Sequence, residues 1–294
     1  MQRHPQFWAY AALLAVCFFW GTTYAAIRMA LESFPPMMIV ALRYILSGGL
    51  LLAGVLAARI PLPSGPELWR TALNGVLVLG IGNGALVFAE LWISSGLAAL
   101  VISLSPFWLL GINATLPPRE HVRPATWLGL IAGLAGAALL VGPGAFEGGI
   151  HGGMLKGFLA LQFGMLGWNA GSLLQRRMPA RAHPIVGGAV QQLAAGLACA
   201  PLALASGGQI HWSMRGSGAL LYLVIFGSIV GYSAYVLAMA RLPVAVVSLY
   251  NYINPVVAVL LGWLLFREPF GLRETIAMLI IFLGVAIVKN FERH

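Results

Sequence analysis

FWAYAALLAVCFFWGTTYAAIR, residues 7–28, is the stretch of sequence that decides the fold. It contains no charged side chain until Arg28, at its end. An α-helix needs roughly 20 predominantly apolar residues to cross the hydrocarbon core of a bilayer. The run is too long for the apolar core of a signal peptide, and no obvious cleavage site follows it. We therefore expect a retained transmembrane helix here.

Nine further apolar runs follow along the chain, separated by short connections that carry prolines and charged residues. These connections are too short to hold a soluble domain with a site of its own. The sequence therefore predicts an all-α polytopic membrane protein with ten transmembrane helices. The ten runs lie near residues 7–28, 37–58, 69–90, 94–115, 125–142, 153–174, 184–205, 217–239, 245–266 and 273–289.

Composition agrees with a membrane protein and disfavours a soluble one. Apolar residues make up 60% of the chain and charged residues 9%, whereas soluble domains carry roughly 25% charged residues. The net charge of +9 is spread singly over the connections, so it does not form a patch for nucleic acid. Lys and Arg favour the N-terminal side by eleven to five. We therefore expect both termini in the cytoplasm, a multi-pass location in the inner (plasma) membrane, and the lipid bilayer as a partner.

Groups that could perform catalysis or bind metal are scarce. The chain has no Asp, all six His lie in connections or at the termini, and only Glu90 of the eight Glu falls within an apolar run. Cys17 and Cys199 are not spaced as a metal site or a disulfide framework, and no Walker loop or His-Glu-x-x-His motif is present. We therefore expect that the protein is not an enzyme and that it has no catalytic residue, bound metal or cofactor. Since ion-coupled carriers usually use intramembrane carboxylates or His, we also expect a facilitator or exchanger without tight proton or sodium coupling.

The chain repeats itself at a spacing of about 148 residues. Each half holds five predicted helices, and an odd number starts the second half on the opposite side of the membrane. We therefore predict a first repeat at 1–147 and a second, inverted repeat at 148–294, joined in one membrane unit. Such repeats are typical of secondary transporters that bind solute where the repeats meet. The matched pairs are Trp20 and Trp168, Arg28 and Arg176, Pro36 and Pro184, Pro106 and Pro255, Glu120 and Glu268, and Gly136 and Gly284.

This layout resembles the EamA family of the drug/metabolite transporter superfamily, over nearly the whole chain. Within that family the chain is most similar to exporters of the YddG type, which carry aromatic and other amino acids. The resemblance implies export of amino acids or related small metabolites, by rocking of the two repeats around a central cavity. The motifs that carry it are Phe19-Trp20-Gly21 with Tyr24, Leu42-Arg43-Tyr44, Ser103-Leu104-Ser105-Pro106, Asn254-Pro255 and Arg267-Glu268-Pro269.

Aromatic and polar residues deep in the apolar runs are the candidates for lining that cavity. Trp and Tyr usually mark membrane interfaces, so rings in mid-run suit a bulky, weakly charged or zwitterionic solute, although core packing explains them too. Asparagines in mid-run either line a cavity or join helices by hydrogen bonds. The predicted cavity residues are Trp20, Tyr24, Asn83, Ser105, Trp168, Asn169, Tyr232, Tyr235, Asn251 and Asn254.

Three further residues are assigned structural or hinge roles. Arg43 lies about two turns inside the second run, where a charge is costly unless it is paired or hydrated. It is either structural, with Glu90 as a possible partner, or in contact with solute. Pro106 and Pro255 interrupt their helices as hinges or as static kinks. Glycines at 80, 84, 129, 133, 136, 227 and 231 are assigned to helix packing alone.

Two other classes of protein stay open. One is a lipid or drug flippase-type carrier, and the other is a non-transporting membrane sensor or subunit. The sequence predicts a small-molecule partner without identifying the solute, and no pattern in it predicts an oligomeric state.

Overall fold

The computed structural model describes residues 5–115, 127–129, 131–139, 153–178, 180–242, 244–247 and 249–291. Every regular element in these ranges is a helix, which confirms the all-α prediction there. Five spans are long and apolar enough to cross a membrane. They are Phe7–Ala30, Pro36–Ala57, Gly65–Ala89, Pro184–Ala205 and Met214–Arg241. Because the other apolar helices are shorter, the arrangement of ten spans stays a prediction.

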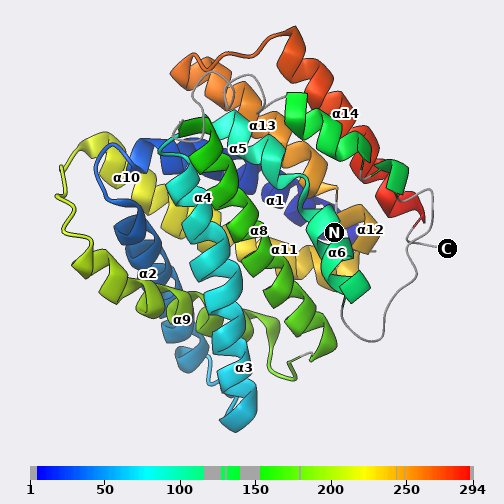
Figure 1. Cartoon of the computed structure of the whole chain (residues 1–294). Helices are drawn as coiled ribbons and strands as arrows, with labels where there is room; N and C mark the ends of the chain where they lie inside the picture. The colour runs from blue at the N-terminus through cyan, green and yellow to red at the C-terminus, as the bar shows by residue number, and fades with distance from the viewer. Residues whose placement is uncertain are drawn as a thin grey trace.

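Helices cover the described parts of all ten predicted runs (Figure 1). The first half contains α1 (Pro5–Ala30), α2 (Pro36–Ala57), α3 (Gly65–Gly75), η1 (Val76–Asn83), α4 (Gly84–Ala89), α5 (Ser95–Ile102), α6 (Ser105–Thr115) and helical residues between 127 and 139. The second contains α8 (Gly153–Arg177), α9 (Pro184–Ala205), α10 (Met214–Tyr222), η2 (Leu223–Val230), α11 (Gly231–Arg241), α12 (Val244–Val247), α13 (Tyr250–Phe266) and α14 (Leu272–Phe291).

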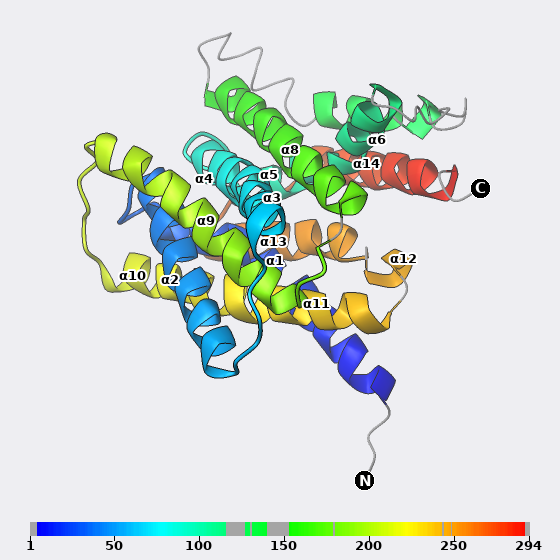
Figure 2. The same cartoon turned by 90° about the horizontal axis from the view of Figure 1, so that it is seen from below.

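The two halves meet in a close contact between α2 and α9, which lie side by side (Figure 1 and Figure 2). A Cβ atom on Gly48 would lie 2.5 Å from the backbone nitrogen of Leu193, and one on Gly196 would lie 2.6 Å from that of Ile45. Only glycine permits so close an approach of two backbones. Gly196 lies 148 residues after Gly48, and Leu193 lies 148 residues after Ile45. The second contact is therefore the first one with the roles of α2 and α9 exchanged.

A second contact between the halves has the same reciprocal form. A Cβ atom on Gly136 would lie 2.7 Å from Ile281, and one on Gly284 would lie 2.7 Å from the Gly133 nitrogen. These four positions again form pairs that are 148 residues apart. An exchange of partners of this kind is expected where two halves are related by a two-fold axis. Glu120, the predicted counterpart of Glu268, lies outside the described residues, as do the two ends of the fifth predicted run.

Two spans change from α- to π-helical hydrogen bonding near their middle. The first does so in η1, between α3 and α4, and the second in η2, between α10 and α11. Each stretch has eight residues, and η2 begins 147 residues after η1. π-Helical turns are rare in proteins, and those that occur often lie at functional sites.

The two predicted proline breaks differ from each other. Pro255 lies inside α13, as expected. Pro106 does not lie in mid-helix, because the chain turns after Ile102 and Pro106 falls in the first turn of α6. A proline costs little at that position, since the missing N–H would have no intrahelical acceptor.

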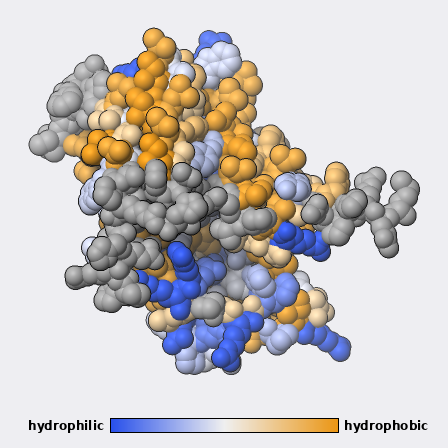
Figure 3. All heavy atoms as spheres, turned by 90° about the vertical axis from the view of Figure 1, so that its right-hand side faces the viewer, coloured by the Kyte–Doolittle hydropathy of each residue, from blue (hydrophilic) through white to orange (hydrophobic). Residues whose placement is uncertain are grey.

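The surface is apolar to a degree that a soluble protein does not show. Large side chains such as Leu14, Leu204 and Leu264 are 67%, 78% and 67% exposed. On the face seen in Figure 3, hydrophobic residues gather over the upper part and hydrophilic residues toward the lower end. A lipid environment accounts for this exposure. The tryptophans near helix ends are all exposed: Trp8, Trp69, Trp92, Trp127, Trp212 and Trp263.

Candidate functional site

A cavity of about 150 Å³ lies where the middle parts of both halves meet. Its lining comes from α1, α2, η1, α4, α5 and α6 of the first half and from α8, α9, η2, α11 and α13 of the second. Both π-helical stretches contribute, through Leu79, Gly82 and Asn83 on one and Gly227 and Ser228 on the other. Gly227 thus borders open space, and helix packing alone does not describe its role.

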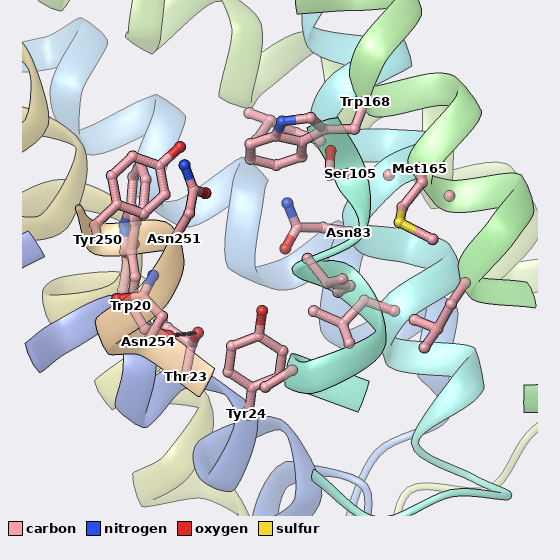
Figure 4. A pocket seen from close by; sticks show the side chains of 18 of the residues that line it. Trp20, Thr23, Tyr24, Asn83, Ser105, Met165, Trp168, Tyr250, Asn251 and Asn254 are labelled. Atoms are coloured by element: carbon pink, nitrogen blue, oxygen red, sulfur yellow. Dashed lines mark hydrogen bonds between the residues drawn. The ribbon is translucent and has the colours of Figure 1, made fainter. Parts of the chain in front are cut away.

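Eight of the ten predicted cavity residues line this space. Figure 4 shows side chains from α1 and α13 facing side chains from η1, α6 and α8, with Tyr24 and Asn83 pointing into the space between. Their contact with a solute stays a prediction. The eight residues are Trp20, Tyr24, Asn83, Ser105, Trp168, Tyr232, Asn251 and Asn254, and Arg43 and Pro255 line the cavity with them.

The other two predicted residues, Asn169 and Tyr235, support the lining without forming part of it. The Asn169 amide donates to Ser105 Oγ (2.9 Å) and to the Met165 carbonyl (2.7 Å), so it fixes two residues that border the cavity. Tyr235 stacks on Trp20, with ring centroids 5.3 Å apart. Both therefore contact residues that border the cavity.

An aromatic cluster forms one wall of the cavity. Tyr250 meets Trp20 edge-on at 5.2 Å and Tyr235 edge-on at 6.0 Å, which completes a triangle with the Trp20–Tyr235 stack. Trp20 Nε1 donates to the Gly227 carbonyl in η2 (3.2 Å). Edge-to-face and offset ring pairs are favourable arrangements, so the three rings form a packed, mostly apolar wall with a few polar atoms.

Arg43 lies on the wall formed by α2 and η2. It is 6% exposed; its Nε donates to Ser228 Oγ (2.8 Å), and its guanidinium carbon lies 5.0 Å from the centre of the Tyr44 ring. The pairing with Glu90 that the sequence left possible is not formed. Arg28 instead donates to the Glu90 backbone carbonyl, and the fully buried Glu90 carboxylate has no hydrogen-bond partner among the described residues.

Gln192 is a polar lining residue that sequence reasoning missed. It is 2% exposed, its Oε1 accepts from Ser47 Oγ, and its Nε2 has no hydrogen-bond partner among the described residues. Gln192 follows Tyr44 by 148 residues, so the repeat that pointed to other residues pointed to this one as well. Ser228 and Tyr250 were missed too, although a polar residue in mid-run and a ring beside Asn251 were the available signals.

A second, larger hollow of about 770 Å³ lies beside the cavity. It is bordered by α3, the end of α8 and the start of α9, and Glu67, Arg70 and Arg177 give it a polar lining. Tyr232 borders both spaces. Tyr232 is therefore the residue that the linings of the two spaces have in common among the described residues.

Comparison with known proteins gives a consistent result. The EamA-like transporter family matches the chain twice, at residues 7–142 and 155–289. The inner membrane transporter YedA of Escherichia coli K12 is 34% identical over 282 residues, which cover 95% of this chain and 90% of YedA. Protein PecM of Dickeya dadantii is 25% identical, covering 93% and 89%. A crystal structure that is 24% identical, with 97% of each chain covered, has the same fold at a TM-score of 0.68. None of these matches singles out the YddG type, so that finer resemblance stays a prediction.

Proposed function

The chain belongs to the EamA-like transporter family, and from this premise we propose that it is a secondary transporter that moves a small solute through the central cavity by alternating access. Members of this family are membrane transporters and not enzymes, and relatives are inner membrane proteins. The observation that carries the proposal is the cavity itself, which both halves line and which shares the lining residue Tyr232 with a larger hollow.

The proposed architecture is a pair of inverted five-helix repeats, at 1–147 and 148–294. Three observations support it. The family matches the chain once in each half. The glycine contacts between the halves exchange partners across 148 residues. The stretches η1 and η2 occupy corresponding positions. Repeats related in this way can rock about a fixed central site, which exposes it to one side and then to the other.

The side chain of Tyr232 acts as the barrier on one side in this proposal. The larger hollow beyond it is lined by Arg70, Arg177 and Arg181. All three lie in or next to connections that the positive-inside rule assigns to the cytoplasm. In this proposal the larger hollow lies on the cytoplasmic side of the cavity, where an exporter would load its cargo.

Amino acids, or related small metabolites, are the proposed cargo. A rigid aromatic wall suits a ring or a thioether, and asparagine side chains supply hydrogen bonds to polar groups. No described carboxylate lines the cavity, and the chain contains no Asp at all. We therefore infer a facilitator or exchanger without tight coupling to protons or sodium.

Counterflow of labelled Phe, Thr and Met in liposomes that hold only this protein tests the proposal. The assay is run with and without pH and sodium gradients, and protein-free liposomes provide the background. We expect flux of at least one amino acid that neither gradient changes. Flux that requires a gradient would retain the transporter and overturn the uncoupled mechanism. Absence of flux, with protein that remains folded and monodisperse, would overturn the cargo.

A further inference from the structure

We propose that Arg43 and Gln192 form a binding site for the carboxylate of the solute. This rests on the proposed function, because it specifies which chemical group the central cavity holds. It also assigns the cavity a polarity, with an anion site on the wall formed by α2, α9 and η2 and an aromatic surface at α1, α11 and α13.

The first step is the unbalanced charge of Arg43. A buried charge is costly unless an opposite charge and hydrogen bonds compensate it. No described carboxylate lies within ion-pair distance of Arg43, and this includes the fully buried Glu90, whose backbone carbonyl accepts from Arg28. The other described glutamates have these partners: Glu32 with Arg215, Glu67 with the backbone of Arg181 and Ala182, Glu268 with Ser95 and Gly96, and Glu274 with Arg273.

The second step is the way in which the guanidinium is held. Nε donates to Ser228 Oγ, and the Tyr44 ring lies 5.0 Å from the guanidinium carbon. A Cβ atom on Gly227 would lie 3.1 Å from Nη2, so a glycine at that position leaves room for the head group. These contacts use one of the five N–H donors of arginine. The terminal nitrogens, which make no hydrogen bond to a described residue, retain the fork that binds a carboxylate through two parallel hydrogen bonds.

The third step is a second donor on the neighbouring helix. Ser47 lies one turn after Arg43 on α2, so the two share a helix face. Ser47 Oγ donates to Gln192 Oε1, which fixes the amide so that Nε2 points away from Ser47. Nε2 is buried without a described acceptor, although Gln192 lines the cavity. A buried donor without an acceptor is costly, and a bound carboxylate oxygen would supply the acceptor that it lacks.

Charge within the cavity points to the same ligand. Arg43 is the one formally charged side chain among the described residues that line it. In a small space with apolar walls, a single cation sets the sign of the potential and favours a negative group. The aromatic wall then receives the remainder of the solute, so the inferred cargo joins a carboxylate to an apolar or aromatic portion.

Binding of phenylacetate and phenylacetamide to the purified full chain tests this site. The two probes share a ring and differ by the carboxylate. We expect phenylacetate to raise the thermal transition temperature of the wild-type protein. Phenylacetamide should need a concentration at least tenfold higher to produce the same rise. Arg43→Gln should remove this preference by weakening phenylacetate binding at least tenfold, because charge-assisted hydrogen bonds are lost. Equal binding of the two probes to the wild type, or no binding of phenylacetate, would overturn the assignment.

Two further variants keep the test independent of folding defects. Gln192→Glu adds a resident carboxylate on the cavity wall and should abolish binding of phenylacetate while the protein remains folded. Arg28→Gln removes an arginine that lies outside the cavity lining, so it should retain the preference for phenylacetate. If Arg28→Gln and Arg43→Gln weaken the binding of both probes to the same extent, the role of Arg43 is structural only.

The same proteins separate this inference from the proposed function. Probe binding with carboxylate preference but without flux in liposomes would retain the anion site and remove the transporter proposal. Flux without any difference between phenylalanine and phenylalaninamide would retain the transporter and remove the anion site.

Discussion

The ring of Tyr232 packs directly against Gly188 of α9, so closely that a Cβ atom at Gly188 would overlap it. The same ring borders both the central cavity and the larger hollow. The position of the proposed barrier therefore depends on the absence of a side chain on the facing helix.

Gly188→Ala should displace the Tyr232 ring and destabilise the protein. Overpacking of this kind costs about 1–3 kcal/mol, which lowers the thermal transition and changes the rate of counterflow. Gly187→Ala is the matched control for stability, because a Cβ atom there meets nothing within 4 Å. Equal transition temperatures for the two variants would contradict the packing of Tyr232 described here.

Gly48→Ala and Gly196→Ala should destabilise the protein to a similar extent, about 1–3 kcal/mol each. Each new methyl group meets backbone atoms of the facing helix, and the two contacts correspond across the repeat. Gly49→Ala is the control, since a Cβ atom there has open space. Thermal unfolding of the three variants in detergent measures the effect. A strong effect of one substitution without the other would argue against a two-fold relation of α2 and α9.

Trp20→Phe should lower counterflow of an aromatic amino acid by about three- to tenfold, the usual value of one hydrogen bond. The substitution keeps a ring and removes the bond from Nε1 to the Gly227 carbonyl, which ties the aromatic wall to η2. Trp263→Phe changes a tryptophan that is 57% exposed and lies outside the cavity. Kinetics of the two variants at several solute concentrations provide the comparison, and an equal loss in both would remove Trp20 from the site.

Glu90→Gln should leave counterflow within about twofold of the wild type and should not alter its response to a pH gradient. Glu90 is the one fully buried glutamate among the described residues, and it does not line the cavity. Glutamine keeps its size and removes its charge. If the wild type shows flux driven by a pH gradient and the variant loses it, the uncoupled mechanism is wrong and Glu90 carries the proton.

Much of this structure follows from one-dimensional patterns. Apolar runs predicted the helices, and the spacing of Trp20 and Trp168 identified two positions that border one cavity. Partners were harder to predict, as Arg43 and Glu90 show. Depth in the membrane suggested a pair, whereas Arg43 donates to Ser228 and the Glu90 carboxylate has no hydrogen-bond partner among the described residues. Gln192 was missed because amides in mid-run were sought only as asparagines. The π-helical stretches had no signal, since their residues are as apolar as those around them.

The π-helical stretch η1 changes which residues of the third span, Gly65–Ala89, share a face. Residues that border the larger hollow recur at 67, 70, 71 and 74, and those that border the cavity recur at 79, 82, 83 and 86. Each set has the 3–4 spacing of one helix face, but the step from Asn74 to Leu79 is five residues. In an unbroken α-helix that extra residue would turn the second set by about 100°. The wider turn of η1 reduces this phase difference, because each π-helical residue turns the chain by less than an α-helical one. The residues that border the two spaces therefore lie closer to one face of the span than a constant α-helical period would place them.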